Sequence, residues 1–180
     1  MNLVTRGNNH LADGAVAEQS HSVNSIVTDA AKSGGVQTDD ARATLRHAAD
    51  QGNPVMIAVA VQEDHAAGDE VLRVVAKTLG ERLRGSDLLG RIGGEEFSVF
   101  LPDTPLQGAV QLAENLRSAV EQCCPDIGST TLAITASIGV ATRSHSAQSM
   151  DAIQQHADQA MYEAKKAGRN RVSALQRDAV

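Results

Sequence analysis

Two adjacent carboxylates lie near the middle of the chain, directly after two glycines, in the segment Gly93-Gly94-Glu95-Glu96. This segment has two interpretations. In the first it is a solvated turn, in which glutamates are ordinary residues. In the second the carboxylates hold a divalent cation beside a phosphate, and the missing glycine side chains let a nucleotide approach the backbone. The tetrapeptide alone does not decide between them, and the surrounding sequence has to.

The composition excludes several other classes of function. The 180 residues carry 16 Lys and Arg against 22 Asp and Glu, and only three aromatic residues. The resulting net charge of −6 repels a phosphate backbone, and few rings are available to stack on bases, so we expect no nucleic-acid binding. The cysteines and histidines lack the spacing of a zinc site. No apolar run is long enough for a membrane span and no signal peptide begins the chain, so we expect a cytoplasmic protein without membrane contact.

Hydrophobic periodicity predicts the elements that position the two glutamates. The predicted strands are 55–61, 88–92, 97–101, 131–140 and 171–175, and the predicted helices are 69–84, 106–120 and 152–167. The first strand is apolar throughout, as in strands buried on both faces. The second and third strands form a hairpin, for which the glycine pair supplies the positive φ of a tight reversal. This order of elements predicts an α+β domain of the split βαβ kind.

The first part of the chain has weaker signals. Residues 1–38 form a poorly defined N-terminal segment, in which residues 23–30 have the apolar spacing of a short helix. A further helix is expected from Thr38 or Asp39 to a break at Gly52. We therefore expect one domain over residues 39–176.

Several segments, in the same order along the chain, resemble the motifs of one family. They are Ala66-Ala67-Gly68-Asp69-Glu70-Val71-Leu72, Arg84-Gly85-Ser86-Asp87, Gly93-Gly94-Glu95-Glu96-Phe97, Leu101-Pro102-Asp103-Thr104, Ser137-Ile138-Gly139-Val140, Ala157-Asp158-Gln159-Ala160-Met161-Tyr162-Glu163-Ala164-Lys165 and Gly168-Arg169-Asn170. Together they resemble GGDEF domains, the bacterial diguanylate cyclases that condense two GTP into the second messenger cyclic di-GMP. The resemblance implies a nucleotide-cyclase palm-like fold, with a central, mostly antiparallel β-sheet flanked by α-helices.

The resemblance implies catalytic roles for the residues at the hairpin tip. Glu95 would be a metal ligand, with Mg²⁺ as the cofactor of any remaining cyclase activity or GTP binding, and Glu96 would be its catalytic neighbour. A divalent cation clamps phosphates and lowers the pKa of an attacking hydroxyl. Gly93 and Gly94 would bind GTP through their backbone.

Three residues outside the hairpin would complete the GTP site. Lys165 and Arg169 would reach the triphosphate, and their i,i+4 spacing would place both on one face of the last helix. Asp69 would accept hydrogen bonds from the guanine edge, because a carboxylate matches its N1–H and N2–H₂ donors.

The sequence departs from the family pattern directly after the first strand. Family members have an Asp-x-Asp segment and a loop there, which supply a metal aspartate, phosphate-binding amides and an asparagine for guanine. Here residues 61–65 join the strand directly to the next motif, and Val61 stands where the first metal aspartate is expected. Either Glu63 or Asp64 would have to replace it. Each lost charge-assisted hydrogen bond is worth about 1.5–3 kcal/mol, so we expect cyclase activity to be lost or strongly impaired.

The Arg-x-x-Asp pair at Arg84 and Asp87 is retained, and in this family it is the inhibitory site, which binds cyclic di-GMP. An arginine fork matches guanine O6 and N7, and a carboxylate accepts from the N1–H and N2–H₂ edge. The alternative is a surface salt bridge between the two. Asn115 replaces an arginine that often contributes to this site in the family. Basic residues gather around the pair in sequence: Arg73, Lys77, Arg82, Arg84 and Arg91.

Three functions therefore remain open. The chain is a degenerate GGDEF domain that binds cyclic di-GMP as a receptor or regulatory module, an active and product-inhibited diguanylate cyclase, or a protein-interaction scaffold that binds neither nucleotide. Cyclic di-GMP is the expected ligand in the first interpretation, with GTP bound but not converted as a further option. A second copy of the chain or another protein is the expected macromolecular partner.

Overall fold

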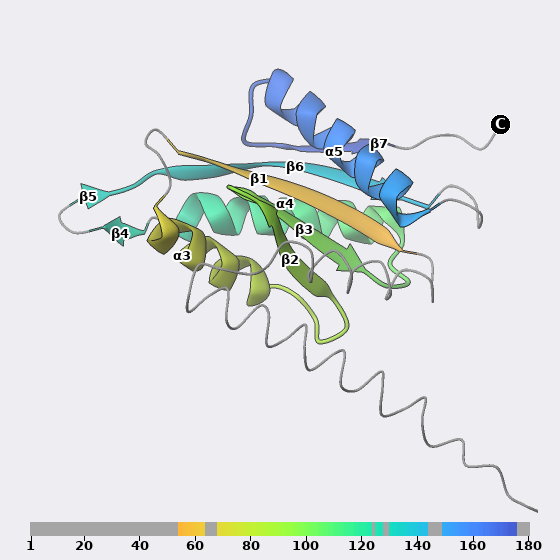
Figure 1. Ribbon diagram of the computed structural model, residues 1–180, viewed down its shortest axis with the longest axis horizontal. Coiled ribbons are helices and arrows are strands. Elements are labelled where there is room, and N and C mark those ends of the chain that lie inside the picture. Colours follow the sequence, from red (N-terminus) through yellow and green to blue (C-terminus); the bar gives the residue numbers. More distant parts are fainter. Residues whose placement is uncertain (1–53, 64–67, 124, 128–129, 144–148, 176–180) are drawn as a thin grey trace, which may run out of the picture.

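Figure 1 shows a computed structural model of the chain, in which helices cover both faces of a five-stranded sheet. The structure describes residues 54–63, 68–123, 125–127, 130–143 and 149–175. The segment 1–38, the two helices expected before residue 53 and the expected domain boundaries at 39 and 176 lie outside these residues.

The strand order across the sheet is β2-β3-β1-β6-β7. The strands are β1 (Val55–Glu63), β2 (Leu88–Gly93), β3 (Glu96–Leu101), β6 (Ile134–Thr142) and β7 (Val172–Leu175). Neighbouring strands are antiparallel, except that β6 and β7 run parallel. The predicted α+β class with a mostly antiparallel sheet is therefore confirmed.

Strand β1 is the centre of the sheet and of the hydrophobic core. Because side chains alternate along a strand, its residues divide between two core layers. Val55, Ile57, Val59 and Val61 lie in one layer, and Met56, Ala58 and Ala60 lie in the other. All seven side chains are at most 1% exposed, which confirms the expectation of a strand buried on both faces.

Three helices cover the two faces. Helices α3 (Asp69–Gly80) and α4 (Leu106–Cys123) pack on one face, and α5 (Met150–Lys166) packs on the other (Figure 1). Helix α3 ends at Gly80, whereas the periodicity predicted a helix to Arg84. The chain tightens there, since Arg82 N–H donates to Leu79 O at 3.1 Å and Leu83 N–H donates to Gly80 O at 3.2 Å. Leu83 still packs against the core after the helix has ended, which explains why the apolar pattern continued.

The strand predicted over 131–140 begins later and ends later, as β6. Thr130–Thr131 instead forms β5, which pairs with β4 (Asp126–Ile127) in a separate two-stranded hairpin. The N–H of Leu132 donates to Pro125 O at 3.1 Å and closes this hairpin beside the end of α4.

Helix α5 lies unusually close to the sheet at Gly139 of β6. A Cβ atom at this position would come within 2.1 Å of Ala157 O and 2.2 Å of Met161 N, so only glycine fits. Ser149 caps the start of α5 by accepting from Ala152 N–H at 3.3 Å. Of the helices that the structure describes, none is both long enough and apolar enough to cross a membrane.

Candidate functional site

Four chain segments reach the same end of the sheet. They are the C-terminal end of β1, the N-terminal end of α3, the β2–β3 hairpin tip and the C-terminal end of α5 (Figure 1). Two contacts join them: Val61 N–H donates to Glu95 O at 3.1 Å, and Lys165 Nζ lies 3.4 Å from Glu96 Oε1. The sheet therefore brings the predicted hairpin, strand and α5 residues together.

The hairpin tip presents one free carboxylate and one paired carboxylate. Glu95 is exposed, and no partner for its side chain is recorded among the described residues. Glu96 is half-buried and its Oε1 forms the ion pair with Lys165. The lysine predicted to bind phosphate thus already touches the glutamate predicted to be catalytic.

The glycines of the tip do not have the backbone conformation that the sequence predicted. Neither Gly93 nor Gly94 has a φ in the left-handed region, and the register instead shifts between Arg91 and Gly93. This irregularity accommodates the reversal without positive φ. A Cβ atom at either glycine would meet nothing within 4 Å, so the fold itself does not require glycine there. What the two glycines provide is open space where a Cβ atom would stand.

The first strand contributes no described carboxylate to this tip. Val61 is 1% exposed and belongs to the core layer below α3. Gln62 is engaged on both sides of its amide, accepting from Ser137 Oγ at 2.9 Å and donating to Ala60 O at 3.1 Å. Strand β1 ends at Glu63 and α3 begins at Asp69, so residues 64–68 are the whole connection.

The described residues do not fit a Mg²⁺ site with two carboxylates. Mg²⁺ prefers oxygen ligands in near-octahedral geometry, and Glu95 is the one unpaired carboxylate at the tip among the residues placed by the structure. No three His, Cys, Asp or Glu side chains gather in a metal-binding cluster within the described part of the chain. Asp64 and the side chain of Glu63, expected as substitutes, lie outside that part.

Asp69 is the first residue of α3 and is exposed. Gly68 precedes it as the N-cap and supplies no side-chain hydrogen bond. The position at the N-terminal end of α3 puts Asp69 on the same end of the sheet as the hairpin tip (Figure 1).

Lys165 and Arg169 do not share a helix face, contrary to the prediction. Helix α5 ends at Lys166, and Gly168 follows with a φ of 115°. Arg169 N–H then donates to Ala164 O at 3.1 Å, which is the bond that closes a Schellman motif. The i,i+4 rule fails because it applies only inside a helix. Arg169 instead lies in the loop beyond α5, with an exposed side chain.

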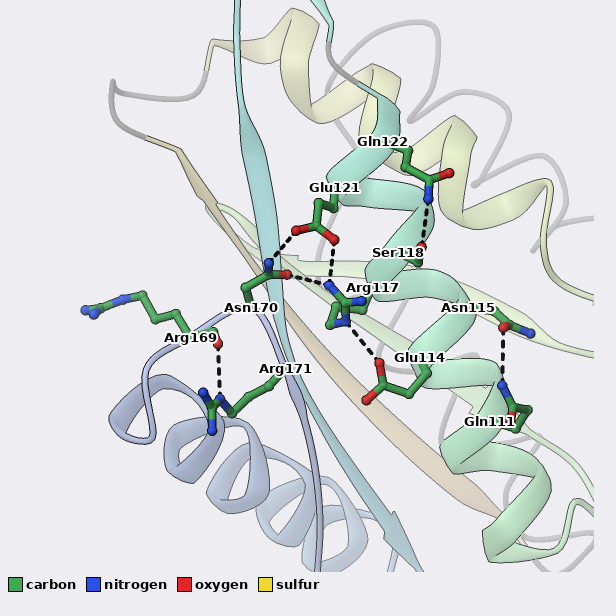
Figure 2. A network of polar contacts seen from close by, with 10 residues as sticks. All are labelled: Gln111, Glu114, Asn115, Arg117, Ser118, Glu121, Gln122, Arg169, Asn170 and Arg171. Atoms are coloured by element: carbon green, nitrogen blue, oxygen red, sulfur yellow. Dashed lines mark hydrogen bonds and ion pairs between the residues drawn. The ribbon is translucent and has the colours of Figure 1, made fainter.

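A polar network holds this loop, and none of its members was among the site residues expected from the sequence. Arg117 Nη1 donates to Asn170 Oδ1 and to Glu121 Oε2, both at 2.8 Å, and Asn170 Nδ2 donates to Glu121 Oε1 at 2.7 Å (Figure 2). Arg117 Nε also donates to Glu114 Oε2 at 3.0 Å. The pKa of Arg117 is raised, first by the hydrogen bond that it donates to Glu121 and then by the one that it donates to Glu114. The pKa of Glu121 is lowered, chiefly by Arg117 and then by Asn170.

The Arg84–Asp87 segment forms a tight turn between α3 and β2. Asp87 Oδ2 accepts the backbone N–H of Arg84 at 2.8 Å, and Asp87 N–H donates back to Arg84 O at 3.0 Å. Asp87 is 9% exposed, whereas Arg84 is exposed. The structure records no ion pair between the two side chains within its described residues, so the predicted alternative of a surface salt bridge is wrong. The carboxylate instead fixes the turn that displays Arg84.

The basic residues near this turn differ in whether their side chains have partners. Arg73 pairs with Glu70 at 2.7 Å and Lys77 with Glu81 at 3.9 Å. Arg91 Nε donates to Gly94 O at 2.7 Å. Asn115, which replaces the expected arginine on α4, accepts from Gln111 at 3.4 Å on an exposed helix face (Figure 2). Arg82 and Arg84 are the members of this cluster with no side-chain partner in the described part of the chain.

Comparisons with known proteins agree with this geometry. The chain is 44% identical over 108 residues to Diguanylate cyclase DgcP of Pseudomonas aeruginosa, which covers 60% of this chain and 16% of that protein. The chain spans less than a third of the length of the curated relatives it matches.

Two solved structures are also similar. The crystal structure of the GGDEF domain of DgcB from Caulobacter crescentus in complex with c-di-GMP has a TM-score of 0.60 and 30% identity, covering 77% of this chain and 85% of that one. Diguanylate cyclase SiaD of Pseudomonas aeruginosa, in complex with its activator SiaC, has a TM-score of 0.69 and 26% identity, covering 90% and 70%. The sequence profile described as "Diguanylate cyclase, GGDEF domain" matches residues 64–171. The chain belongs to the GGDEF domain family of diguanylate cyclases.

Proposed function

We propose that this chain binds cyclic di-GMP at Arg84 and Asp87, and that it is a degenerate GGDEF domain whose cyclase activity is lost or strongly impaired. The observation that carries the proposal is the turn itself. Its aspartate is buried and bonded to the backbone, while its arginine is exposed and has no partner among the described residues. The turn is held rigidly by its aspartate, yet the arginine side chain makes no stabilising contact with the residues that the structure describes. We infer that the arginine serves to recognise a ligand rather than to stabilise the turn.

The chemistry of cyclic di-GMP fits this turn. A guanidinium fork donates to guanine O6 and N7 in one plane, which a lysine cannot reproduce. Asp87 is 9% exposed, and its carboxylate would accept from the guanine N1–H and N2–H₂ donors in addition to the bonds it accepts within the turn. Arg82 and Arg84 together add positive charge for the two phosphates. The complex of the DgcB domain with c-di-GMP supports the choice of ligand.

The loss of cyclase activity follows from the first strand. The buried Val61 occupies the expected metal position, and residues 64–68 are too few to replace the phosphate-binding loop. Cyclisation of GTP needs both charge neutralisation and exact positioning of the reacting groups. Losing several such contacts lowers a rate by powers of ten, because each 1.36 kcal/mol is worth about tenfold.

GTP binding without conversion is a second candidate function. Lys165 lies at the hairpin tip and Arg169 is exposed in the loop behind it. A Cβ atom at Gly93 or Gly94 would meet nothing within 4 Å, so a ligand can approach the backbone from that side, while Gly94 O accepts from Arg91 Nε. These groups are suited to holding a triphosphate, since arginine, lysine and backbone amides commonly donate hydrogen bonds to phosphate oxygens.

Calorimetric titration with cyclic di-GMP tests the main proposal. We expect Arg84→Ala to weaken binding by about tenfold to a hundredfold, the usual value of a bidentate arginine–guanine contact. Arg82→Ala is the matched control, because it removes the same charge from a neighbouring exposed arginine whose side chain has no partner among the described residues either. We expect it to weaken binding about two- to threefold, through screened attraction alone. Equal effects of the two substitutions, or no binding by the unaltered chain, would contradict the proposal.

A second measurement tests the loss of activity. Purified protein incubated with GTP and Mg²⁺ is expected to form no detectable cyclic di-GMP. Turnover that disappears in Glu95→Ala would instead establish an active cyclase. A chain that binds neither GTP nor cyclic di-GMP would be the scaffold, and its partner would have to be a protein or a second copy.

A further inference from the structure

Three consecutive residues after α5 have a left-handed backbone. Their φ angles are 115° for Gly168, 58° for Arg169 and 45° for Asn170. Glycine adopts such angles freely, and asparagine tolerates them, but arginine does so at a steric cost. Strained conformations of this kind persist only where surrounding contacts enforce them, and they gather at ligand sites. Specific contacts must therefore hold this loop in its strained conformation, and the loop is a candidate ligand site.

The side-chain amide of Asn170 holds the left-handed backbone of this loop in place. Its oxygen accepts from Arg117 Nη1 at 2.8 Å and its nitrogen donates to Glu121 Oε1 at 2.7 Å, so both ends of the amide are fixed by α4 (Figure 2). Arg117 in turn is only 19% exposed and is held between Glu114 and Glu121. We call Arg117, Glu121 and Asn170 the clamp. An aspartate at position 170 would lose the donor, so the clamp is specific for an amide.

The backbone of Arg169 is fixed by two hydrogen bonds. Its backbone N–H donates to Ala164 O at 3.1 Å, and its backbone carbonyl accepts from Arg171 Nε at 3.2 Å. With both main-chain groups engaged, the direction of its side chain is set by the loop. Figure 2 shows the guanidinium of Arg169 extending away from the clamp, and the structure records no partner for it among the described residues.

We propose that Arg117 and Glu121, acting through Asn170, are positioning residues that hold the loop after α5 so that Arg169 presents its guanidinium to the triphosphate of a bound nucleotide. The inference rests on the GTP-binding candidate described above. It adds to that site two residues of α4, Arg117 and Glu121, which lie 53 and 49 positions before Asn170 in sequence.

Calorimetric titration of the full chain with GTP and Mg²⁺ tests the clamp. We expect Arg117→Lys, which keeps the charge but loses the fork, to weaken GTP binding about tenfold, close to the effect of Arg169→Ala. Asn170→Gly allows the left-handed backbone without strain but removes the amide, and we expect a similar loss in a folded protein. Gln122→Ala is the control, since it removes an exposed hydrogen bond to Ser118 on the same helix and is expected to change nothing.

A double variant separates positioning from general destabilisation. If Arg117 acts through Arg169, then Arg117→Lys has no further effect on GTP affinity in an Arg169→Ala background. Cyclic di-GMP affinity, measured in parallel, is expected to stay within twofold of the unaltered chain. Additive losses in the double variant, or equal losses for both nucleotides, would overturn the proposal.

A measurement without ligand distinguishes failure of this inference from failure of the GTP-binding function. Backbone amide resonances of residues 168–171 are expected to shift in Arg117→Lys and to keep their positions in Gln122→Ala. If the unaltered chain binds no GTP but these resonances shift, the clamp stands and the GTP function is wrong. If they do not shift, the clamp does not position Arg169, whatever GTP does.

Discussion

The turn at Arg84–Asp87 and the hairpin tip at Glu95 are both proposed to meet guanine nucleotides, yet they are built in opposite ways. The turn consists of four consecutive residues, and its two main contacts join Arg84 to Asp87. The tip is bonded to β1 and α5 as well as built from its own strands, and α3 begins at the same end of the sheet. A site carried by a local turn survives a shortened connection elsewhere, whereas a site assembled from four segments does not.

The α5 side and the β1 side of the hairpin tip also differ from each other. Its α5 side is intact, because Lys165 still reaches Glu96 and the clamp still fixes the loop that carries Arg169. Its β1 side is not, because the strand presents the apolar Val61 and an engaged amide at Gln62. We expect binding of a triphosphate to need mainly the first side, and catalysis to need both. This division is why GTP binding and turnover are expected to separate in this protein.

The largest effect is expected from an attempt to repair the β1 side. Val61→Asp places a carboxylate at the expected metal position, but Val61 is 1% exposed and packs in the core below α3. Burying an unpaired charge costs several kcal/mol, so we expect the free energy of unfolding in urea to fall by about 3 kcal/mol or more. We expect no gain of cyclic di-GMP synthesis, since the missing loop is not restored.

Val61→Thr is the control for this substitution. Threonine keeps the shape of valine and adds one buried hydroxyl, so the loss should be smaller, about 1–2 kcal/mol. A Val61→Asp protein that is as stable as the unaltered chain and makes cyclic di-GMP would show that one carboxylate is enough. The hairpin tip would then lack only a single side chain, and the shortened connection after β1 would not be what impairs it.

Much of the fold was predictable because each element has its own hydrophobic period. The seven apolar residues of β1, the Gly-Gly hairpin between β2 and β3 and the glycine stop after α5 were all recognisable locally. Boundaries failed where side chains continued to pack after the backbone had changed. Leu83 is an example, since it still reaches the core beyond the end of α3 at Gly80.

The site was less predictable, because its decisive contacts are not local. The clamp joins Arg117 to Asn170 across 53 positions, and no periodic pattern contains that pair. One signal was available: Arg117 has a glutamate three positions before it and another four positions after it, an arrangement that holds an arginine in place on a helix. The alternative of a salt bridge between Arg84 and Asp87 failed for a different reason. A carboxylate three residues after an arginine bonds the arginine's backbone as readily as its side chain.

An intermediate effect is expected at Asp87, where structure and recognition meet. Asp87→Ala removes the acceptor for Arg84 N–H, and we expect about 1–2 kcal/mol less stability together with weaker cyclic di-GMP binding. Asp87→Asn keeps an acceptor oxygen for the turn but loses the carboxylate that is proposed to bind guanine. We therefore expect it to fold almost normally and still to bind cyclic di-GMP more weakly than the unaltered chain. GTP affinity should be the same in all three proteins, and a change in it would remove the independence of the two sites.

The smallest effect is expected from pH, and it belongs to the α5 side alone. Glu121 faces Arg117 and Asn170, with Glu114 across the guanidinium, and its pKa lies below the usual value, chiefly because it accepts from Arg117. Since the folded-state pKa is the lower one, the stability from this carboxylate is complete above the unfolded value of about 4.3 and disappears as the pH falls through the folded value. Glu121→Gln should therefore be slightly less stable than the unaltered chain in urea at about pH 6, and the difference should shrink as the pH falls below the usual glutamate range. An exposed ion pair contributes little, so the difference will be small, but a difference that grows in acid would mean that Glu121 is not held by the clamp.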